Sequence, residues 1–238
     1  MSVRDALATL VARFDLPAGA EDALDAYLVL LAEDPTAPTT VTDPRRAVDE
    51  HIADALVALD LDVVRAATRV ADLGAGAGVP GIPLAIALPT AHVTLVDSLE
   101  RKGAFLRRAV DVTGVQNVDV VVARAEAWPA GRELHDVILA RAVAPLGVLA
   151  EYAAPLLALG GSLVAWKGQP EPEEEADARY AAELLGLEVE DRRPVTPWAG
   201  AERRSLYVLR KVAPTPSRYP RREGMARKRP LRAADRPA

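Results

Sequence analysis

From Arg69 onward the chain alternates short apolar runs with longer stretches of helical periodicity. The apolar runs are predicted to form strands at residues 69–73, 92–97, 117–122, 135–140, 161–166, 187–192 and 204–210. Alternation of strands with helical segments is typical of a doubly wound sheet that carries helices on both faces. We therefore predict an α/β fold, Rossmann-like, with a mostly parallel sheet of seven strands.

Residues 1–67 show helical periodicity without such runs. Ser2 and Asp5 are spaced as a capping box, and Asp43 followed by Pro44 predicts the start of a later helix that continues through His51 to Leu59. The predicted organisation is an N-terminal helical cap at 1–67, an α/β domain at 68–211 and a flexible tail at 212–238.

Composition excludes several classes of site. The chain has 0 Cys, so disulfides, thiolate zinc sites, iron–sulfur clusters and cysteine nucleophiles are ruled out. No apolar run approaches the roughly 18 residues that a membrane span requires. The absence of cysteine fits a reducing, cytoplasmic compartment, and the absence of a span predicts a soluble protein without a membrane partner. We also predict a monomer that holds no metal.

Charge is distributed unevenly along the chain. Residues 210–238 contain 10 basic and 2 acidic residues, a net charge of +8, which leaves −13 for residues 1–209 of a chain whose total is −5. A basic tail on an acidic body is typical of an arm that binds a polyanion, although a solvated tail without a binding role has the same composition.

The first strand runs directly into a glycine-rich loop, VADLGAGAGVPGIP. Within it Gly76, Gly78 and Gly81 fit the GxGxxG pattern, and Asp97 follows at about the distance of a ribose-binding acid. Glycines between a strand and a helix let the backbone approach a bound cofactor closely. A dinucleotide and S-adenosylmethionine are both candidates for this position.

Asp72 distinguishes the two cofactors. Its carboxylate, two residues before Gly74, would repel a pyrophosphate and attract the cationic end of S-adenosylmethionine. Asp97, at the end of the second strand, would accept hydrogen bonds from the ribose. The structural alternatives are a turn or helix cap for Asp72 and an N-cap for Asp97.

Two consecutive stretches carry a resemblance to a known family. DLGAGAGVPGIPLAIALP and LVDSLERKGAFLRR resemble the signature of the RsmG (GidB) type 16S rRNA guanine-N7 methyltransferases, in the class I S-adenosylmethionine-dependent methyltransferase superfamily. The resemblance continues through NVDVVVARAEAW, ARA, WKG, RRSLYVLRK and SRYPRREGMARKRPL, about two-thirds of the chain. It implies methyl transfer from S-adenosylmethionine to N7 of a guanosine, position 527, in 16S rRNA or the small ribosomal subunit.

The resemblance also implies residue roles. Gly74, Val79, Ala125 and Glu126 line the cofactor, and Arg141 reaches the cofactor and orients the substrate without moving a proton. A salt bridge to an acid at the end of the sheet is the alternative for Arg141. The complete set predicted to bind cofactor is Asp72, Gly74, Gly76, Gly78, Val79, Asp97, Ala125, Glu126 and Arg141.

The N-terminal part departs from the family pattern. The family's HxxDS element is HIADA here, with Ala55 in place of the serine, and APTTVTDP replaces a segment that usually carries an Asn-Leu pair. His51 and Asp54 lie one helical turn apart, which suits either a contact at the pocket rim or a helix-packing or capping pair. The role of the cap therefore stays open.

Basic residues late in the chain are predicted to hold the RNA backbone. They are Lys167, Arg218, Arg221, Arg222, Arg227, Lys228 and Arg229. Lys167 is equally compatible with a plain exposed lysine. We expect a chain without residues 212–238 to bind RNA less tightly and with a weaker dependence on salt, and to keep its affinity for S-adenosylmethionine almost unchanged.

Three other functions remain compatible with the residues. They are methylation of a small molecule, a nicotinamide-dependent oxidoreductase, and an RNA-binding protein with a vestigial cofactor pocket. The intact glycine loop argues against the last of these.

Overall fold

The computed structural model describes residues 2–169 and 171–236. They divide into two compact units, one of residues 2–122 with 196–201 and the other of residues 123–169 and 171–195 with 202–236. The N-terminal helices share a unit with the first three strands. The cap, α/β domain and tail of the predicted organisation stay a prediction. Residues 1, 237 and 238, at the outer ends of the predicted cap and tail, lie outside the described residues.

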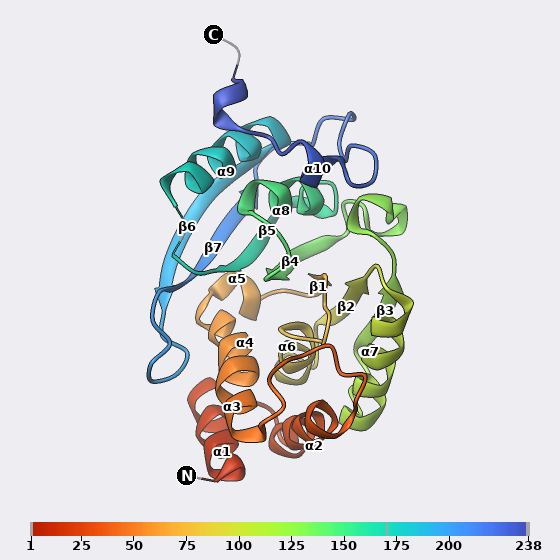
Figure 1. Ribbon diagram of the computed structural model, residues 1–238, viewed down its shortest axis with the longest axis vertical. Helices are drawn as coiled ribbons and strands as arrows, with labels where there is room; N and C mark the ends of the chain where they lie inside the picture. Colours follow the sequence, from red (N-terminus) through yellow and green to blue (C-terminus); the bar gives the residue numbers. More distant parts are fainter. Residues whose placement is uncertain (1, 170, 237–238) are drawn as a thin grey trace. The chain divides into compact units, whose positions relative to one another are not determined.

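Three parallel strands form the sheet of the first unit. They are β1 (Arg69–Leu73), β2 (His92–Asp97) and β3 (Val118–Val122), in the order β3-β2-β1. All of β1 and β2 except the first residue of each is buried, as expected for strands covered on both faces. Helix α6 (Gly81–Ala87) connects β1 to β2, and α7 (Glu100–Thr113) connects β2 to β3 (Figure 1).

Helices α1 (Val3–Phe14) and α2 (Ala20–Glu33) pack against each other in this unit, and α2 also contacts α6 and α7. The predicted capping box is confirmed, because Ser2 Oγ accepts from the Asp5 amide and the Asp5 carboxylate accepts from the Ser2 amide. In α2 the hydroxyl of the fully buried Tyr27 donates to the Ala77 carbonyl at 2.5 Å. The cap is thereby joined directly to the glycine loop.

The helix predicted after Pro44 changes type along its length. Asp43 accepts from the Arg46 amide at 2.8 Å, which confirms the predicted N-cap. The segments that follow are α3 (Pro44–Ala47), the π-helix η1 (Val48–Ala53), α4 (Asp54–Leu56), the 3₁₀ turn η2 (Val57–Asp60) and α5 (Asp62–Arg65). The wide π turn points Val48, His51 and Ile52 into the unit, where all are buried.

Four strands form the sheet of the second unit, in the order β4-β5-β7-β6. They are β4 (His135–Arg141), β5 (Leu157–Lys167), β6 (Leu187–Val195) and β7 (Arg204–Lys211). The β4–β5 pair is parallel, and β7 is antiparallel to both β5 and β6. All seven predicted strands are therefore present, and the predicted α/β class with a mostly parallel seven-stranded arrangement is confirmed.

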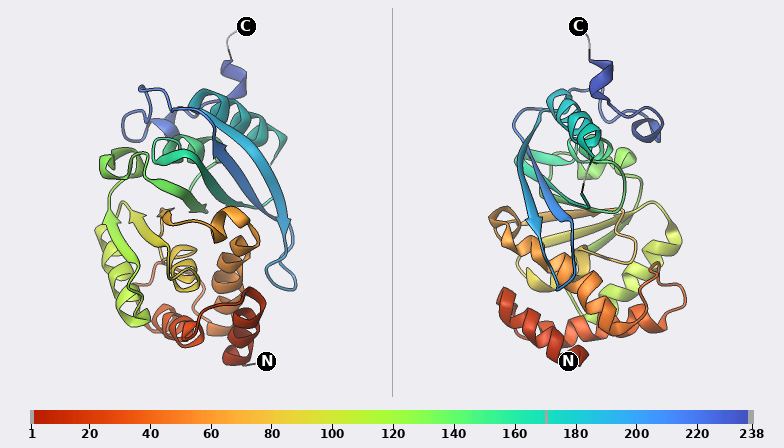
Figure 2. Two further views of the ribbon diagram at one scale, coloured as in Figure 1. Left: turned by 180° about the vertical axis from the view of Figure 1, so that it is seen from behind. Right: turned by 60° about the vertical axis from the view of Figure 1, so that its left-hand side comes forward.

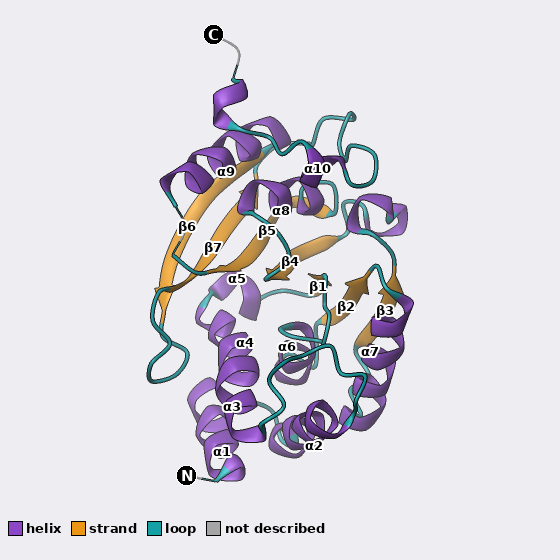
Figure 3. Cartoon of the chain, in the orientation of Figure 1, coloured by secondary structure: helices purple, strands orange, loops and turns teal. Residues whose placement is uncertain are grey.

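Helices and short helical turns complete the second unit (Figure 3). They are η3 (Ala125–Ala127), η4 (Pro129–Gly131), α8 (Leu146–Ala153), α9 (Pro172–Leu185), α10 (Met225–Lys228) and η5 (Ala233–Asp235). The helix predicted over 145–159 ends at Ala153, and β5 begins at Leu157. No helix among residues 2–169 and 171–236 has both the length and the apolar character needed to cross a membrane.

The C-terminal segment packs against helices of its own unit. Helix α10 contacts α8 and η5 contacts α9, and the chain can be followed along these helices in Figure 2. Tyr219 is 7% exposed and Ala226 is 4% exposed. Up to residue 236 the tail is therefore an attached part of the fold, whereas its charge pattern predicts a flexible arm.

A partly buried hydrogen bond in this unit predicts a pH effect on stability. Tyr207 donates to Glu175 at 2.7 Å, and this hydrogen bond holds the pKa of that carboxyl below its usual value. A lowered folded pKa stabilises the protein above the unfolded pKa, and this contribution disappears as the pH falls through the folded pKa.

We expect Glu175→Gln to lower the melting temperature at pH 7 by about 2–4 °C, the effect of a loss of roughly 1 kcal/mol. The difference between variant and wild type should shrink as the pH falls below about 4.5, the usual pKa of glutamate. Thermal melts across this range measure it. A difference that stays constant with pH would contradict the assignment.

Candidate functional site

The glycine-rich loop is hydrogen-bonded to the carboxyl end of β2. The amides of Gly74 and Ala75 both donate to the Val96 carbonyl, at 2.8 and 3.0 Å. Gly78 has φ +91°, and a Cβ there would lie 2.7 Å from Ile82 Cγ1. Only glycine suits this position, because a side chain would meet both backbone strain and a steric clash.

Asp97 joins the end of β2 to the loop. Its Oδ2 accepts from the Gly76 amide at 3.1 Å and from Lys102 Nζ at 3.3 Å, and its Oδ1 accepts from the Leu99 amide at 3.1 Å. The residue is 4% exposed. The bond from the Leu99 amide closes a turn before α7, but the N-cap of that helix is Leu99, so the N-cap alternative for Asp97 is wrong. Asp97 also lies against the loop, as the cofactor hypothesis requires.

Asp72 has a clear structural role. Its Oδ2 accepts from the Gly81 amide at 2.9 Å, at the first residue of α6, and the side chain is 1% exposed. The carboxylate therefore stabilises the beginning of α6 from within the unit. This matches the helix-capping alternative for Asp72, and any effect on a cofactor would be electrostatic rather than by contact at an open surface.

The loop residues differ in their exposure. Gly74 is exposed and Gly76 is half-buried, so their backbone is accessible. Gly78 is buried and Val79 is 5% exposed. Among these four residues, Gly74 and Gly76 offer the loop backbone to a ligand.

The remaining predicted cofactor residues belong to the second unit. Ala125 and Glu126 form the 3₁₀ turn η3, and Glu126 Oε1 accepts from the Gly224 amide at 3.0 Å. Arg141 is the last residue of β4 and is half-buried. Ala142, which follows it, has φ +56°, an unfavourable conformation for a residue with a side chain. Such strain is often found at functional sites.

Lys167, a predicted RNA contact, is the last residue of β5. Its Nζ lies 2.5 Å from Glu174 Oε1, and the same oxygen accepts from the Leu146 amide. Glu174 also lines a pocket of about 450 Å³ together with other acidic residues. Phosphate binding by Lys167 would therefore require the exchange of an existing ion pair in acidic surroundings.

The tail cations fall into two groups. Arg221 forms a bidentate ion pair with the buried Glu151, and Arg227 donates to the Val143 carbonyl at 2.7 Å. Arg222, Lys228 and Arg229 are exposed, and their side chains make no hydrogen bond or ion pair to any other described residue. Arg218 is exposed over the ring of Tyr219, 5.2 Å from its centre. The exposed cations Arg218, Arg222, Lys228 and Arg229 are therefore available to a polyanion.

His51 is part of the packing of the first unit. It is 6% exposed, its Nε2 lies 2.9 Å from Thr39 Oγ1 and its Nδ1 lies 3.1 Å from the Glu50 carbonyl. Asp54 is 0% exposed. These positions favour the helix-packing alternative for His51 and Asp54.

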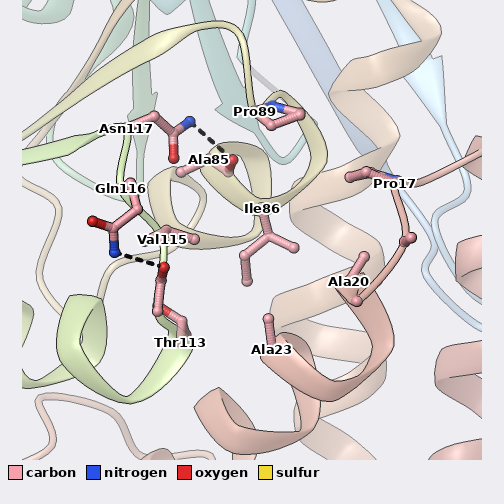
Figure 4. Close-up of a pocket in the computed structure, with 13 residues that line it drawn as sticks. Pro17, Ala20, Ala23, Ala85, Ile86, Pro89, Thr113, Val115, Gln116 and Asn117 are labelled. Carbon is pink, nitrogen blue, oxygen red and sulfur yellow. Dashed lines mark hydrogen bonds between the residues drawn. The ribbon is translucent and has the colours of Figure 1, made fainter.

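A pocket of about 330 Å³ in the first unit has none of the predicted site residues in its lining (Figure 4). Its lining includes the end of α6, the start of α2 and residues 113–117 before β3, and none of its lining residues is ionisable. Asn117 beside it donates to the carbonyls of Ala85, Leu88 and Ala91. In open α/β sheets ligands bind at the carboxyl ends of the strands, so this pocket is a poor candidate for the cofactor.

Comparisons with known proteins establish the family. Residues 21–196 match the family model GidB, rRNA small subunit methyltransferase G. The chain belongs to this family. A ribosomal RNA small subunit methyltransferase G of Rubrobacter xylanophilus is 48% identical over 220 residues, covering 88% of this chain and 83% of the relative. One of Roseiflexus castenholzii is 45% identical over 196 residues, covering 81% and 83%.

Membership of this family confirms the resemblance seen in the sequence. The predicted enzyme class, an S-adenosylmethionine-dependent methyltransferase of small-subunit rRNA, is confirmed with it at the level of the family.

Solved structures support the fold of this methyltransferase-family chain. A branched-chain polyamine synthase of Thermus thermophilus matches with a TM-score of 0.60 and 17% identity, covering 84% of this chain and 66% of the synthase. The fibrillarin pre-rRNA processing protein of Methanococcus jannaschii matches with a TM-score of 0.51 and 17% identity, covering 63% and 69%. At such identities these structures show a shared fold.

Two charged residues, one in each unit, make contacts that were not predicted from the sequence. Lys102 bonds Asp97 from the first turn of α7, and Glu151 is 1% exposed within α8. The signal for Glu151 was present, because one acidic residue in the apolar segment LGVLAEYA indicates a buried charge that requires a partner. This signal does not identify the partner of Glu151, which is Arg221, 70 residues later in the sequence.

Proposed function

We propose that the chain transfers a methyl group from S-adenosylmethionine to N7 of a guanosine in 16S rRNA, at the family position 527. The observation that carries the cofactor assignment is the bond from the Gly76 amide to Asp97 at the end of β2. A carboxylate there, next to accessible loop backbone, suits the ribose hydroxyls of an adenosine.

The charges near the loop fit this cofactor. Asp72 and Asp97 are both buried acids beside the glycine loop. Negative charge stabilises the sulfonium and ammonium groups of S-adenosylmethionine and repels the pyrophosphate of a dinucleotide. This supports S-adenosylmethionine over NAD. The roles of Gly74, Gly76, Gly78, Val79, Ala125 and Glu126 as cofactor contacts are part of the proposal.

The chemistry requires positioning rather than proton transfer. Bound S-adenosylmethionine supplies an electrophilic methyl group, and guanine N7 has an in-plane lone pair and no proton. The chain therefore has to hold the reactants in line and exclude water, and no general base is assigned. We assign Arg141 to orienting the substrate through a phosphate or the guanine O6 edge.

The position of guanine N7 in RNA limits how the substrate can bind. A-form RNA hides guanine N7 in a deep, narrow groove, so the target has to lie in a loop or leave its stack. Arg218, Arg222, Lys228 and Arg229 are exposed and suited to the surrounding phosphates. We propose that the enzyme acts on the RNA or the small subunit in the cytoplasm; its monomeric state stays a prediction.

Labelled S-adenosylmethionine and hypomethylated small-subunit particles test the proposal. The expected result is incorporation of label, mapped to one guanosine by aniline cleavage. Methylation of a free metabolite instead would favour the small-molecule alternative. Binding of NADH without S-adenosylmethionine would favour an oxidoreductase, and RNA binding without either cofactor would indicate a vestigial pocket.

Arg141→Ala is expected to reduce methyl transfer at least tenfold, the effect of losing one charged hydrogen bond to substrate. The melting temperature should stay within about 2 °C of wild type. Arg210→Ala is the control. It also removes one arginine, but Arg210 lies on β7, pairs with Glu190 at 3.6 Å and has no role in the proposed site. Equal turnover by Arg141→Ala and wild type would remove Arg141 from the site.

A further inference from the structure

Residues 221–229 combine contacts to the rest of the second unit with cations that make no such contact. Arg221, the Gly224 amide and Arg227 contact α8 and two loops of the second unit. The side chains of Arg222, Lys228 and Arg229 are exposed and make no hydrogen bond to another described residue. Within nine residues the chain therefore combines structural contacts with free positive charge.

The first of these contacts is the ion pair between Arg221 and Glu151. Arg221 Nε and Nη2 donate to the two carboxylate oxygens of Glu151 at 2.7 and 2.5 Å. Glu151 is 1% exposed, and this interaction raises the pKa of Arg221. A bidentate pair fixes orientation as well as distance, so the start of the segment has a defined position on α8.

Three further contacts reach the loops that precede and follow β4. Glu223 Oε2 lies 3.3 Å from Arg124 Nε, and the Gly224 amide donates to Glu126 at 3.0 Å. Arg227 Nη2 donates to the Val143 carbonyl at 2.7 Å. Val143 is two residues after Arg141, across the strained Ala142.

These loops carry residues of the proposed site. Glu126 is a proposed cofactor contact, and Arg141 is proposed to orient the substrate. A strained conformation such as that of Ala142 persists only when its surroundings hold it. The Arg227 bond to the next carbonyl supplies such support from outside the loop.

We propose that Arg221, Gly224 and Arg227 are positioning residues, which hold the loops of Glu126 and Arg141 for cofactor binding. The C-terminal segment thus serves the cofactor site as well as the RNA. The inference rests on the proposed function. It also changes the expectation from charge alone, since a chain without residues 212–238 should lose cofactor affinity together with RNA affinity.

Two neighbouring residues of α10 separate positioning from charge. Arg227→Ala and Lys228→Ala each remove one positive charge, but only Arg227 bonds the Val143 carbonyl. Titration calorimetry with S-adenosylmethionine in the absence of RNA should show about fivefold weaker binding for Arg227→Ala, the effect of one lost hydrogen bond. Lys228→Ala should stay within about twofold of wild type, and Arg227→Lys should recover most of the affinity.

The outcomes distinguish the two proposals. Equal affinity of Arg227→Ala and wild type, or equal losses in Arg227→Ala and Lys228→Ala, would overturn the positioning role and leave the methyltransferase assignment intact. Failure of the wild type to bind S-adenosylmethionine would overturn both. Melting curves of the three variants confirm that each is folded, and the affinities are compared only at temperatures well below the transitions.

Discussion

Replacing Asp97 by alanine is expected to weaken S-adenosylmethionine binding by about 100-fold, because two hydrogen bonds from ribose hydroxyls to a charged acceptor are lost. The loop also loses the bond that holds the Gly76 amide at 3.1 Å. Titration calorimetry measures the affinity, and single-turnover methyl transfer measures the chemical consequence. Asp97→Asn should also bind weakly, since an amide nitrogen would face the Gly76 amide or Lys102.

The control for this variant is Asp119→Ala. Asp119 is an exposed acid on β3 that contacts His92 at 3.0 Å, so its loss removes the same charge without touching the loop. Cofactor affinity should be unchanged within about twofold. If Asp97→Ala binds as tightly as Asp119→Ala, Asp97 does not bind the ribose and the cofactor assignment loses its main support.

Arg221→Ala is expected to produce the largest loss of stability, about 3 kcal/mol in the free energy of unfolding. The reason is that the carboxylate of Glu151, 1% exposed, loses its bidentate partner, and an unpaired buried charge costs about 3–5 kcal/mol. The Arg221 side chain is 24% exposed, which admits some water and favours the lower end of this range. Urea denaturation measures the effect.

Arg222→Ala is the matched control. It removes the neighbouring arginine, which is exposed, and should change the free energy of unfolding by less than about 0.5 kcal/mol. Replacing both members of the pair, Glu151→Leu with Arg221→Leu, should recover most of the stability because no buried charge remains. If Arg221→Ala and Arg222→Ala are equally stable, the ion pair does not hold the segment on α8.

Local sequence signals predicted the elements that determine the fold class. The strands at 69–73 and 92–97 have the predicted ends, because buried parallel strands are continuous apolar runs bounded by polar or glycine residues. Ser2 and Asp43 cap helices as predicted, since an N-cap needs only a side-chain oxygen within three residues of the amide it accepts from. The resemblance around the glycine loop identified the family.

Other features depended on residues far apart in the sequence. The helix expected through His51 contains a π turn, because that turn packs Val48, His51 and Ile52 into one unit. Lys211 counts toward the basic end of the chain, yet it is 2% exposed and its Nζ donates to the Leu157 carbonyl at 2.7 Å. Burial lowers the pKa of Lys211, which a count of charges cannot indicate.

By itself the sequence determined the family, the order of strands and helices, and the acids and glycines around the first two strands, because these depend on neighbours a few residues apart. Only the tertiary structure decided what the charged residues do. In the folded chain Asp72 accepts a hydrogen bond at the start of α6. Of the tail cations, Arg221 pairs with Glu151, Arg227 donates to the Val143 carbonyl, and others are exposed to solvent. A charge takes its role from its partner and its burial, and both are set by segments that meet only when the chain folds.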